Sequence, residues 1–197
     1  MKTLLLVLPL FLFACDGGGS DASAPTVPSR RGDGVVAAPQ KQVDLAEFCE
    51  QHPAADQAKA MAWPTLDEPQ PAKSSGWTWV NVWATWCGPC VEEMPRLERW
   101  KAKLSAEGVA VALHFLSVDA KADDVALFHK RNPSSPTGVR LAQFEQLEPW
   151  LSTIGLDATS VLPIHLFVDP EDRIRCVRMG SVSETDYDTV KRVLAGE

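Results

Sequence analysis

The sequence lacks several features that would assign it to common classes of protein. It has no basic excess, because 26 acidic side chains outnumber 19 basic ones and give a net charge of -7. Proteins that bind nucleic acids usually carry a basic stripe, so we expect no nucleic-acid partner. The longest apolar run, Thr3 to Phe13, is too short to span a bilayer comfortably. Five cysteines in 197 residues are too few for a disulfide-dense scaffold, although an odd number raises the question of what the unpaired one does.

The N-terminus has the pattern of an export signal. Lys2 precedes the apolar run, which ends in Leu-Phe-Ala-Cys at positions 12–15. This ending resembles the lipobox of bacterial lipoproteins, in which the cysteine is lipidated and becomes the new N-terminus. We therefore predict a lipoprotein signal peptide over residues 1–14 and lipidation of Cys15, with a general secretion signal as the alternative. Two or more acyl chains would anchor the protein, whereas one binds a membrane only marginally.

The composition changes after the signal. Residues 15–40 are rich in Gly, Ser, Ala and Pro and show no apolar periodicity, which predicts a flexible, lipid-anchored linker. About 25 residues of this type would reach roughly 25 to 30 Å. Asp16, directly after the cysteine, resembles an inner-membrane retention signal. The folded domain is expected over residues 41–197, without an internal repeat.

The apolar pattern of the domain predicts an α/β fold. Two strands joined by a helix imply a parallel βαβ unit, and a later hairpin adds antiparallel strands. The result is a mixed central sheet with helices on both faces and an N-terminal helical extension. Pro149 is expected to break or kink its helix. The predicted strands are 77–85, 109–118, 164–168 and 174–179, and the predicted helices are 43–51, 89–107, 122–130, 140–154 and 184–194.

The residues Cys87-Gly88-Pro89-Cys90 lie where the first clear strand meets the first clear helix. Unpaired N–H groups and the dipole at a helix N-terminus stabilise a thiolate, so Cys87 is predicted to be the attacking sulfur. Cys90, one turn further along, is placed to resolve the mixed disulfide. Gly88 lets a partner approach closely, and Pro89 is tolerated in a first helical turn.

Two other interpretations of the CxxC motif remain open but are disfavoured: half of a zinc site and a purely structural disulfide. Zinc needs four ligands, the sequence has no second CxxC, and its four histidines show no ligand spacing. We therefore predict no metal and no cofactor other than a redox-active Cys87–Cys90 disulfide.

The segment WVNVWATWCGPCVEEMP resembles the active-site region of the thioredoxin superfamily, specifically its TlpA/ResA-like branch of exported, membrane-tethered bacterial thiol-disulfide oxidoreductases. The resemblance extends as a fold pattern from Trp63 to the C-terminus and is most specific over Asn81 to Pro95. It implies a thioredoxin fold. It also implies that Pro163 is cis and faces the disulfide, with the backbone of Leu162 pairing with substrate. Without the resemblance, Pro163 would be interpreted as a strand-start proline.

The resemblance also implies roles for residues around the motif. Glu93 should lie partly buried beneath the disulfide and tune the thiols or take a proton, the alternative being a surface residue of an acidic first turn. Asn81 stands where cytosolic thioredoxin has a buried Asp, so that proton-accepting role falls to Glu93 or water. Trp86 should contribute to partner docking. His165 follows Pro163 by two residues, but we favour a strand-face histidine without a role at the site.

Cys49 and Cys176 remain. In an exported protein two leftover thiols often pair, so a structural disulfide that ties the N-terminal extension to the sheet is our hypothesis. Free buried thiols are the alternative.

The expected function is a thiol-disulfide oxidoreductase anchored to the bacterial inner membrane through Cys15, with its domain in the periplasm. The Gly-Pro dipeptide matches that of reducing thioredoxins, which favours reduction of disulfides in exported partner proteins, as in cytochrome c maturation. Electrons would then come from a membrane thiol transporter, since no nicotinamide or flavin motif is present. The alternatives are an exported disulfide oxidase or isomerase and a non-catalytic binding module.

Overall fold

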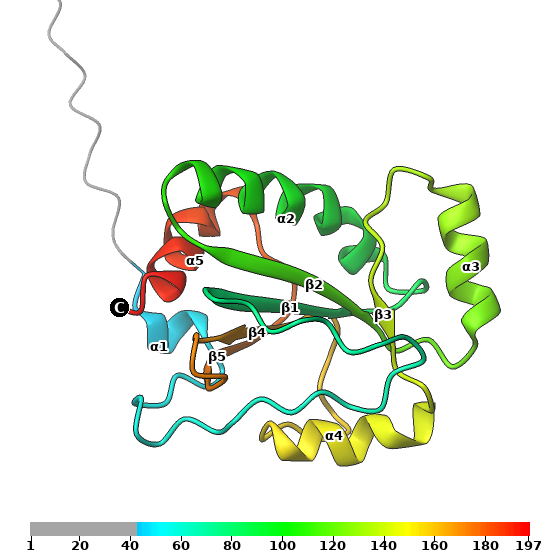
Figure 1. Cartoon of the computed structure of the whole chain (residues 1–197), viewed down its shortest axis with the longest axis horizontal. Helices are drawn as coiled ribbons and strands as arrows, with labels where there is room; N and C mark the ends of the chain where they lie inside the picture. Colours follow the sequence, from blue (N-terminus) through cyan, green and yellow to red (C-terminus); the bar gives the residue numbers. More distant parts are fainter. Residues whose placement is uncertain (1–42) are drawn as a thin grey trace, which may run out of the picture. The chain divides into compact units, whose positions relative to one another are not determined.

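The computed structural model describes residues 43–197, which contain one five-stranded mixed sheet with helices on both faces (Figure 1). The strand order is β3-β2-β1-β4-β5, with β1, β2 and β3 parallel and β4 antiparallel to β1 and β5. The predicted fold class is therefore confirmed. The predicted signal peptide (1–14), the predicted lipidation site Cys15 and the predicted linker (15–40) lie outside the described residues. The strands are β1 (Trp77–Trp83), β2 (Val111–Ser117), β3 (Val139–Arg140), β4 (Ile164–Val168) and β5 (Ile174–Met179).

Five helices surround the sheet. Figure 1 shows α2 and α5 on one face and α4 on the other, while α2 is the crossover between the parallel strands β1 and β2. None of the helices among residues 43–197 is long and apolar enough to cross a bilayer. The helices are α1 (Leu45–Phe48), α2 (Gly88–Ala106), α3 (Ala122–Arg131), α4 (Leu147–Thr153) and α5 (Tyr187–Leu194), with 3₁₀ turns at Phe144–Gln146 and Glu184–Asp186.

Aromatic side chains fill the core between the sheet and α2. Trp79 of β1 stacks on Phe167 of β4, with ring centroids 5.1 Å apart, and lies 6.5 Å from Trp100 of α2. Trp100 in turn meets Tyr187 of α5 edge-on at 5.4 Å. Because alternate residues of a strand face the same side, Asn81 of β1 and His165 of β4 point into this same layer. The fold thus brings two buried polar residues to the face on which α2 lies.

The N-terminal extension is attached to the edge strand β5. The Cys49–Cys176 disulfide joins them, and Gln51 and Val177 exchange backbone hydrogen bonds of 3.3 and 2.9 Å. The predicted pairing of the two cysteines is therefore present. Because Gln51 has to pair with β5, the chain is extended from Cys49 onward, and α1 is shorter than the predicted helix over residues 43–51.

The helix predicted over residues 140–154 is wrong in its first part. Val139 and Arg140 form β3, and α-helix begins only at Leu147. The Arg140 guanidinium, 7% exposed as a residue, pairs with Asp67 and donates to the Asp119 carbonyl at 2.8 Å, so distant partners hold this segment extended. Pro149 neither breaks nor ends α4, because it is the third residue, where a helix does not need the missing N–H.

Candidate active site

The two cysteines of the CGPC motif form a disulfide at the N-terminus of α2. Cys87 is the N-cap residue, and its Sγ accepts from the Cys90 backbone N–H at 3.3 Å. Cys87 is 6% exposed whereas Cys90 is fully enclosed. The Cys90 N–H and the dipole at the start of the helix stabilise a thiolate at Cys87. The geometry therefore makes Cys87 the sulfur that a partner can reach and Cys90 the internal one.

A buried aspartate anchors the loop that leads into the motif. Asp119, 2% exposed, accepts from the Thr85 backbone N–H at 2.9 Å and from the Thr85 hydroxyl at 2.7 Å. It also accepts from the Ser117 hydroxyl at 2.8 Å. These bonds hold the chain two residues before Cys87. The sequence analysis missed Asp119, whose only local signal is an acidic residue two positions after the end of β2.

The surface around Cys87 is exposed and partly apolar. Trp86, the residue before Cys87, is 69% exposed although it is a large hydrophobic side chain. Gly88 and Pro89 also lie at the surface. A Cβ on Gly88 would meet nothing within 4 Å, so Gly88 leaves open space next to the disulfide.

The Leu162–Pro163 peptide bond is cis, as the resemblance implies. Ile164 pairs with Val82 of β1, which places Pro163 beside the end of β1, from which the chain continues to Cys87. Within the described residues, the amide and carbonyl of Leu162 make no hydrogen bond. Leu162, which is half-buried, therefore presents free backbone groups just before β4 begins.

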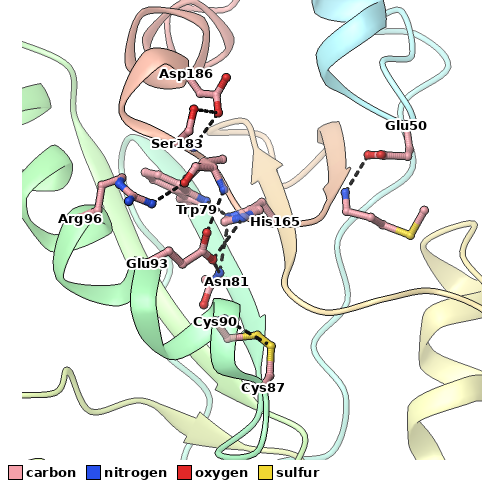
Figure 2. Close-up of polar contacts among 12 residues, drawn as sticks. Glu50, Trp79, Asn81, Cys87, Cys90, Glu93, Arg96, His165, Ser183 and Asp186 are labelled. Atoms are coloured by element: carbon pink, nitrogen blue, oxygen red, sulfur yellow. Dashed lines mark hydrogen bonds and ion pairs between the residues drawn. A yellow bond between two sulfur atoms is a disulfide. The ribbon is translucent and has the colours of Figure 1, made fainter.

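Glu93 is buried more deeply than predicted, with 1% of the residue exposed, so the interpretation as a surface residue is wrong. Its Oε1 accepts from Asn81 Nδ2 at 2.8 Å, and its Oε2 accepts from the Val182 backbone N–H at 2.9 Å (Figure 2). Glu93 lies one helical turn beyond Cys90, so this hydrogen-bonded carboxyl follows the redox centre on the next turn of α2.

His165 lies on strand β4, as predicted, and its side chain is close to this carboxyl, which the sequence analysis did not expect. The imidazole is fully buried, and its Nε2 lies 3.4 Å from Glu93 Oε1. Its Nδ1 accepts from Trp79 Nε1 at 3.2 Å. Figure 2 shows the three side chains together above the disulfide. The register of β4 against β1, which pairs His165 with Asn81, creates this contact and is not visible in the local sequence.

The half-zinc interpretation does not fit the structure, because both remaining cysteines of the described part form a disulfide with each other. In the same part of the chain, no cluster of three His, Cys, Asp or Glu side chains has the arrangement of a metal site. The chemistry that the residues support is thiol-disulfide exchange.

No protein-family model matches the chain. Among curated proteins, the thioredoxin-like protein YneN of Bacillus subtilis is 37% identical over 49 residues, which cover 25% of this chain and 29% of YneN. The thiol-disulfide oxidoreductase ResA of Bacillus thuringiensis is 25% identical over 95 residues, 48% of this chain and 50% of ResA. The chain thus matches half or less of the length of these relatives.

Solved structures with a similar fold include a thioredoxin-related protein from Neisseria meningitidis serogroup B, which is 26% identical with a TM-score of 0.48 and is matched over 66% of this chain and 93% of that one. A putative thiol:disulfide interchange protein DsbE from Chlorobium tepidum is 21% identical, with a TM-score of 0.48 and coverage of 62% and 81%.

The similarity to the curated relatives agrees with the chain's own features. The mixed sheet, the CGPC disulfide at the start of α2 and the cis proline before β4 occur together, as the resemblance implies. Together with the similarity to ResA over about half of the chain, these features make the chain similar to the TlpA/ResA-like branch of the thioredoxin superfamily.

Proposed function

We propose that the protein is a thiol-disulfide oxidoreductase that reduces disulfides in exported partner proteins. The observation that carries this proposal is the pair of unequal sulfurs at the start of α2, with Cys87 slightly exposed and Cys90 enclosed. A dithiol of this kind can react with one partner sulfur at a time and then release it.

The exchange proceeds in two steps once the dithiol is reduced. The Cys87 thiolate attacks a partner disulfide, a mixed disulfide forms, and one partner sulfur leaves as a thiolate. Cys90 then gives its proton to the Glu93 carboxylate and attacks Cys87 Sγ. The Cys87–Cys90 disulfide forms, the mixed disulfide breaks, and the second partner sulfur leaves as a thiolate. Two electrons thereby pass from the protein to the partner, and a proton stays on Glu93 until solvent removes it.

The partner would dock across the cis-proline loop. The free backbone groups of Leu162 can pair with an extended partner segment as an added strand would. Trp86 offers apolar contact area beside Cys87, and Gly88 leaves room for the partner backbone. This arrangement recognises main chain more than side chains, so it suits a set of different protein disulfides.

The tether and the electron source are part of the same proposal. Lipidation of Cys15 would anchor the domain to the inner membrane on its periplasmic side, and a membrane thiol transporter would then reduce the Cys87–Cys90 disulfide. Cytochrome c maturation is one process that needs such a reductant. Replacing Cys15 by Ser should move the protein from the membrane fraction to the soluble fraction of its cells, and unchanged membrane association of C15S would contradict the anchor.

The activity is tested by the reduction of insulin disulfides with dithiothreitol as electron source. The wild type should accelerate insulin precipitation, and Cys87→Ser should abolish the acceleration. The double variant C49A/C176A, which leaves the CGPC motif intact, is the matched control and should retain it. A wild type without acceleration would favour a non-catalytic binding module.

The direction of electron flow is tested by the reduction potential of the Cys87–Cys90 pair. A reductant should have a potential below about -250 mV, whereas a value near about -120 mV would assign the protein to the oxidases.

A further inference from the structure

Four buried side chains form a polar group between α2 and the sheet: Trp79, Asn81, Glu93 and His165. Trp79, Asn81 and His165 are fully enclosed and Glu93 is 1% exposed. Figure 2 shows the group on the interior side of the disulfide. Buried polar atoms that lack partners destabilise a fold, so the hydrogen bonds within this group restrict which atoms carry protons.

The tautomer of His165 follows from its neighbours. The indole N–H of Trp79 can only donate, so His165 Nδ1 must accept and carries no proton. The amide of Asn81 also approaches Nδ1, with Nδ2 at 3.5 Å. A cationic imidazole would place an Nδ1–H against both donors. The network therefore assigns the neutral form with its proton on Nε2.

Among the described residues, the Glu93 carboxylate lies close to Nε2 of His165. Nε2 is buried, makes no hydrogen bond of normal geometry, and has Glu93 Oε1 at 3.4 Å. The ring is held in place, because it lies parallel to Phe167 at 6.3 Å and 5.9 Å from the Trp79 ring. The ring therefore holds Nε2 at 3.4 Å from Glu93 Oε1. Glu93 Oε1 is then flanked by two donors, Asn81 and His165, while Val182 supplies the third at Oε2.

The nearby cations, Arg178 and Arg96, donate to oxygens other than those of Glu93. Arg178 of β5 is the register partner of His165, but its Nη1 donates to the Phe48 carbonyl at 2.8 Å. Arg96 of α2 donates to the Val182 carbonyl. Arg96 also pairs with Glu184 at 3.2 Å. Within the described residues neither cation pairs with Glu93, so its carboxyl is left to the neutral donors of the group.

We propose that His165 is a positioning residue that acts through Glu93: its Nε2–H holds the carboxyl in place and favours the carboxylate that accepts the Cys90 proton. This inference depends on the proposed function, because it concerns the step in which Cys90 attacks the mixed disulfide. His165 gains no proton and undergoes no redox change in this step. The proton moves from the Cys90 thiol to Glu93, and the electrons move between sulfurs only.

The kinetic test measures partner release from a preformed Cys87 mixed disulfide across pH 5 to 9 in the full chain. His165→Phe keeps the ring but loses both nitrogens. We expect its pH profile to shift to higher pH and its release rate at pH 6.5 to fall about tenfold, within the range of general acid–base effects. His165→Gln retains an N–H donor for Glu93 and should recover most of the rate. An unchanged profile in H165F would overturn the proposal.

A double-mutant comparison separates a role through Glu93 from a loss of packing. In a Glu93→Gln background, H165F should cause less than a twofold further change in release rate, because both variants remove the same interaction. The initial attack of Cys87 on the partner should also stay within twofold in H165F. A tenfold further loss in the double variant would assign His165 a purely structural effect and overturn the proposal.

An NMR measurement on the wild-type chain remains decisive if the variants do not fold. Nitrogen chemical shifts of His165 should show a protonated Nε2 and an unprotonated Nδ1, and the opposite tautomer would overturn the proposal. The same spectrum, compared with the insulin assay, separates the proposed function from the proposed role of His165. If the wild type fails to reduce insulin while the Nε2–H tautomer is observed, the proposed function fails and the assigned contact stands.

Discussion

Glu93 is buried, hydrogen-bonded and one helical turn from Cys90. Its carboxyl lies in the interior on α2 and accepts from Asn81 and from Val182. Asn81 cannot ionise, so Glu93 is the titratable member of this pair. A carboxyl placed one turn from the enclosed Cys90 is suited to take the proton that Cys90 must lose.

Replacing Glu93 by Gln should slow partner release from the Cys87 mixed disulfide by about 10²-fold, since the proton acceptor is lost while the side-chain shape is kept. The measurement is single-turnover release monitored by stopped flow. Glu92→Gln is the matched control, because Glu92 is exposed on the same turn. Equal rates in E93Q and E92Q would remove Glu93 from the mechanism.

His114 of β2 lies on the face of the sheet opposite to Asn81 and affects how stability depends on pH. Burial lowers the pKa of His114, and the charge of Lys101 lowers it further. The unfolded chain binds a proton at this histidine below about pH 6.5, whereas the folded state resists it. The unfolded state thus binds more protons as the pH falls below about 6.5, and stability is lost in that range and is unaffected above it.

Replacing His114 by Phe should therefore reduce the acid sensitivity of the fold. The Phe ring can keep the edge contact with Trp63, whose centroid lies 5.8 Å from that of His114. Urea unfolding at pH 7.5 and 5.5 should show a smaller loss of unfolding free energy in H114F than in wild type. The exposed His52 provides the control variant H52F. If H114F lost more unfolding free energy than wild type between pH 7.5 and 5.5, the predicted effect of His114 would be contradicted.

Residues differ in how far the local sequence predicts their surroundings. Cys87 and Cys90 could be placed from the sequence, because a strand followed directly by CGPC and a periodic helix is a local pattern. The full burial of Glu93 and the contact of His165 could not. Both depend on the pairing of β4 with β1, which joins segments more than 80 positions apart.

At the scale of elements, the N-terminal extension acts as a cover for the edge of the sheet. The isolated pairing of Gln51 with Val177 and the disulfide from Cys49 to Cys176 protect β5 from pairing with another chain. Arg178 adds a hydrogen bond to the Phe48 carbonyl and lies over the Phe48 ring, 4.5 Å from its centroid. The extension is thus held by covalent, polar and aromatic contacts.

The double variant C49A/C176A should lose about 2–4 kcal/mol of unfolding free energy, because the disulfide closes a long loop in the unfolded chain. The sequence separation of 127 residues makes this loop most of the domain. Chemical denaturation monitored by tryptophan fluorescence gives the difference. Insulin reduction by the same variant should remain near wild type, and a stability change below about 0.5 kcal/mol would argue against the clamp.

The bounds of helices and strands could be predicted from the sequence where a single local pattern determines them. The bounds of β4 and β5 agree with the apolar runs at 164–168 and 174–179, which are separated by a polar turn. In that turn Asp169 accepts from the backbone of Arg173 at 2.9 Å. β3 was not predictable, because a helix-like apolar spacing continues through it and the interactions that extend it come from Asp67 and Asp119.

At the scale of the whole molecule, the sheet brings segments that are distant in the sequence to the region around the Cys87–Cys90 disulfide. β1 leads into Cys87, β4 begins after Pro163, and Asp119 at the end of β2 holds the loop before the motif. The parallel order of β1 and β2 followed from the helix between them, but the position of the hairpin beside β1 required the structure. The redox centre therefore depends on the sheet topology as much as on the motif.

The central claim is that Cys87 attacks and Cys90 resolves. The most direct test is to incubate the reduced variants Cys90→Ala and Cys87→Ala with a disulfide-bonded peptide and to identify the adduct by mass spectrometry. We predict a stable mixed disulfide at Cys87 in C90A, and little or none in C87A because Cys90 is enclosed. An adduct at Cys90 that forms as fast as the one at Cys87, or no adduct in either variant, would contradict the account.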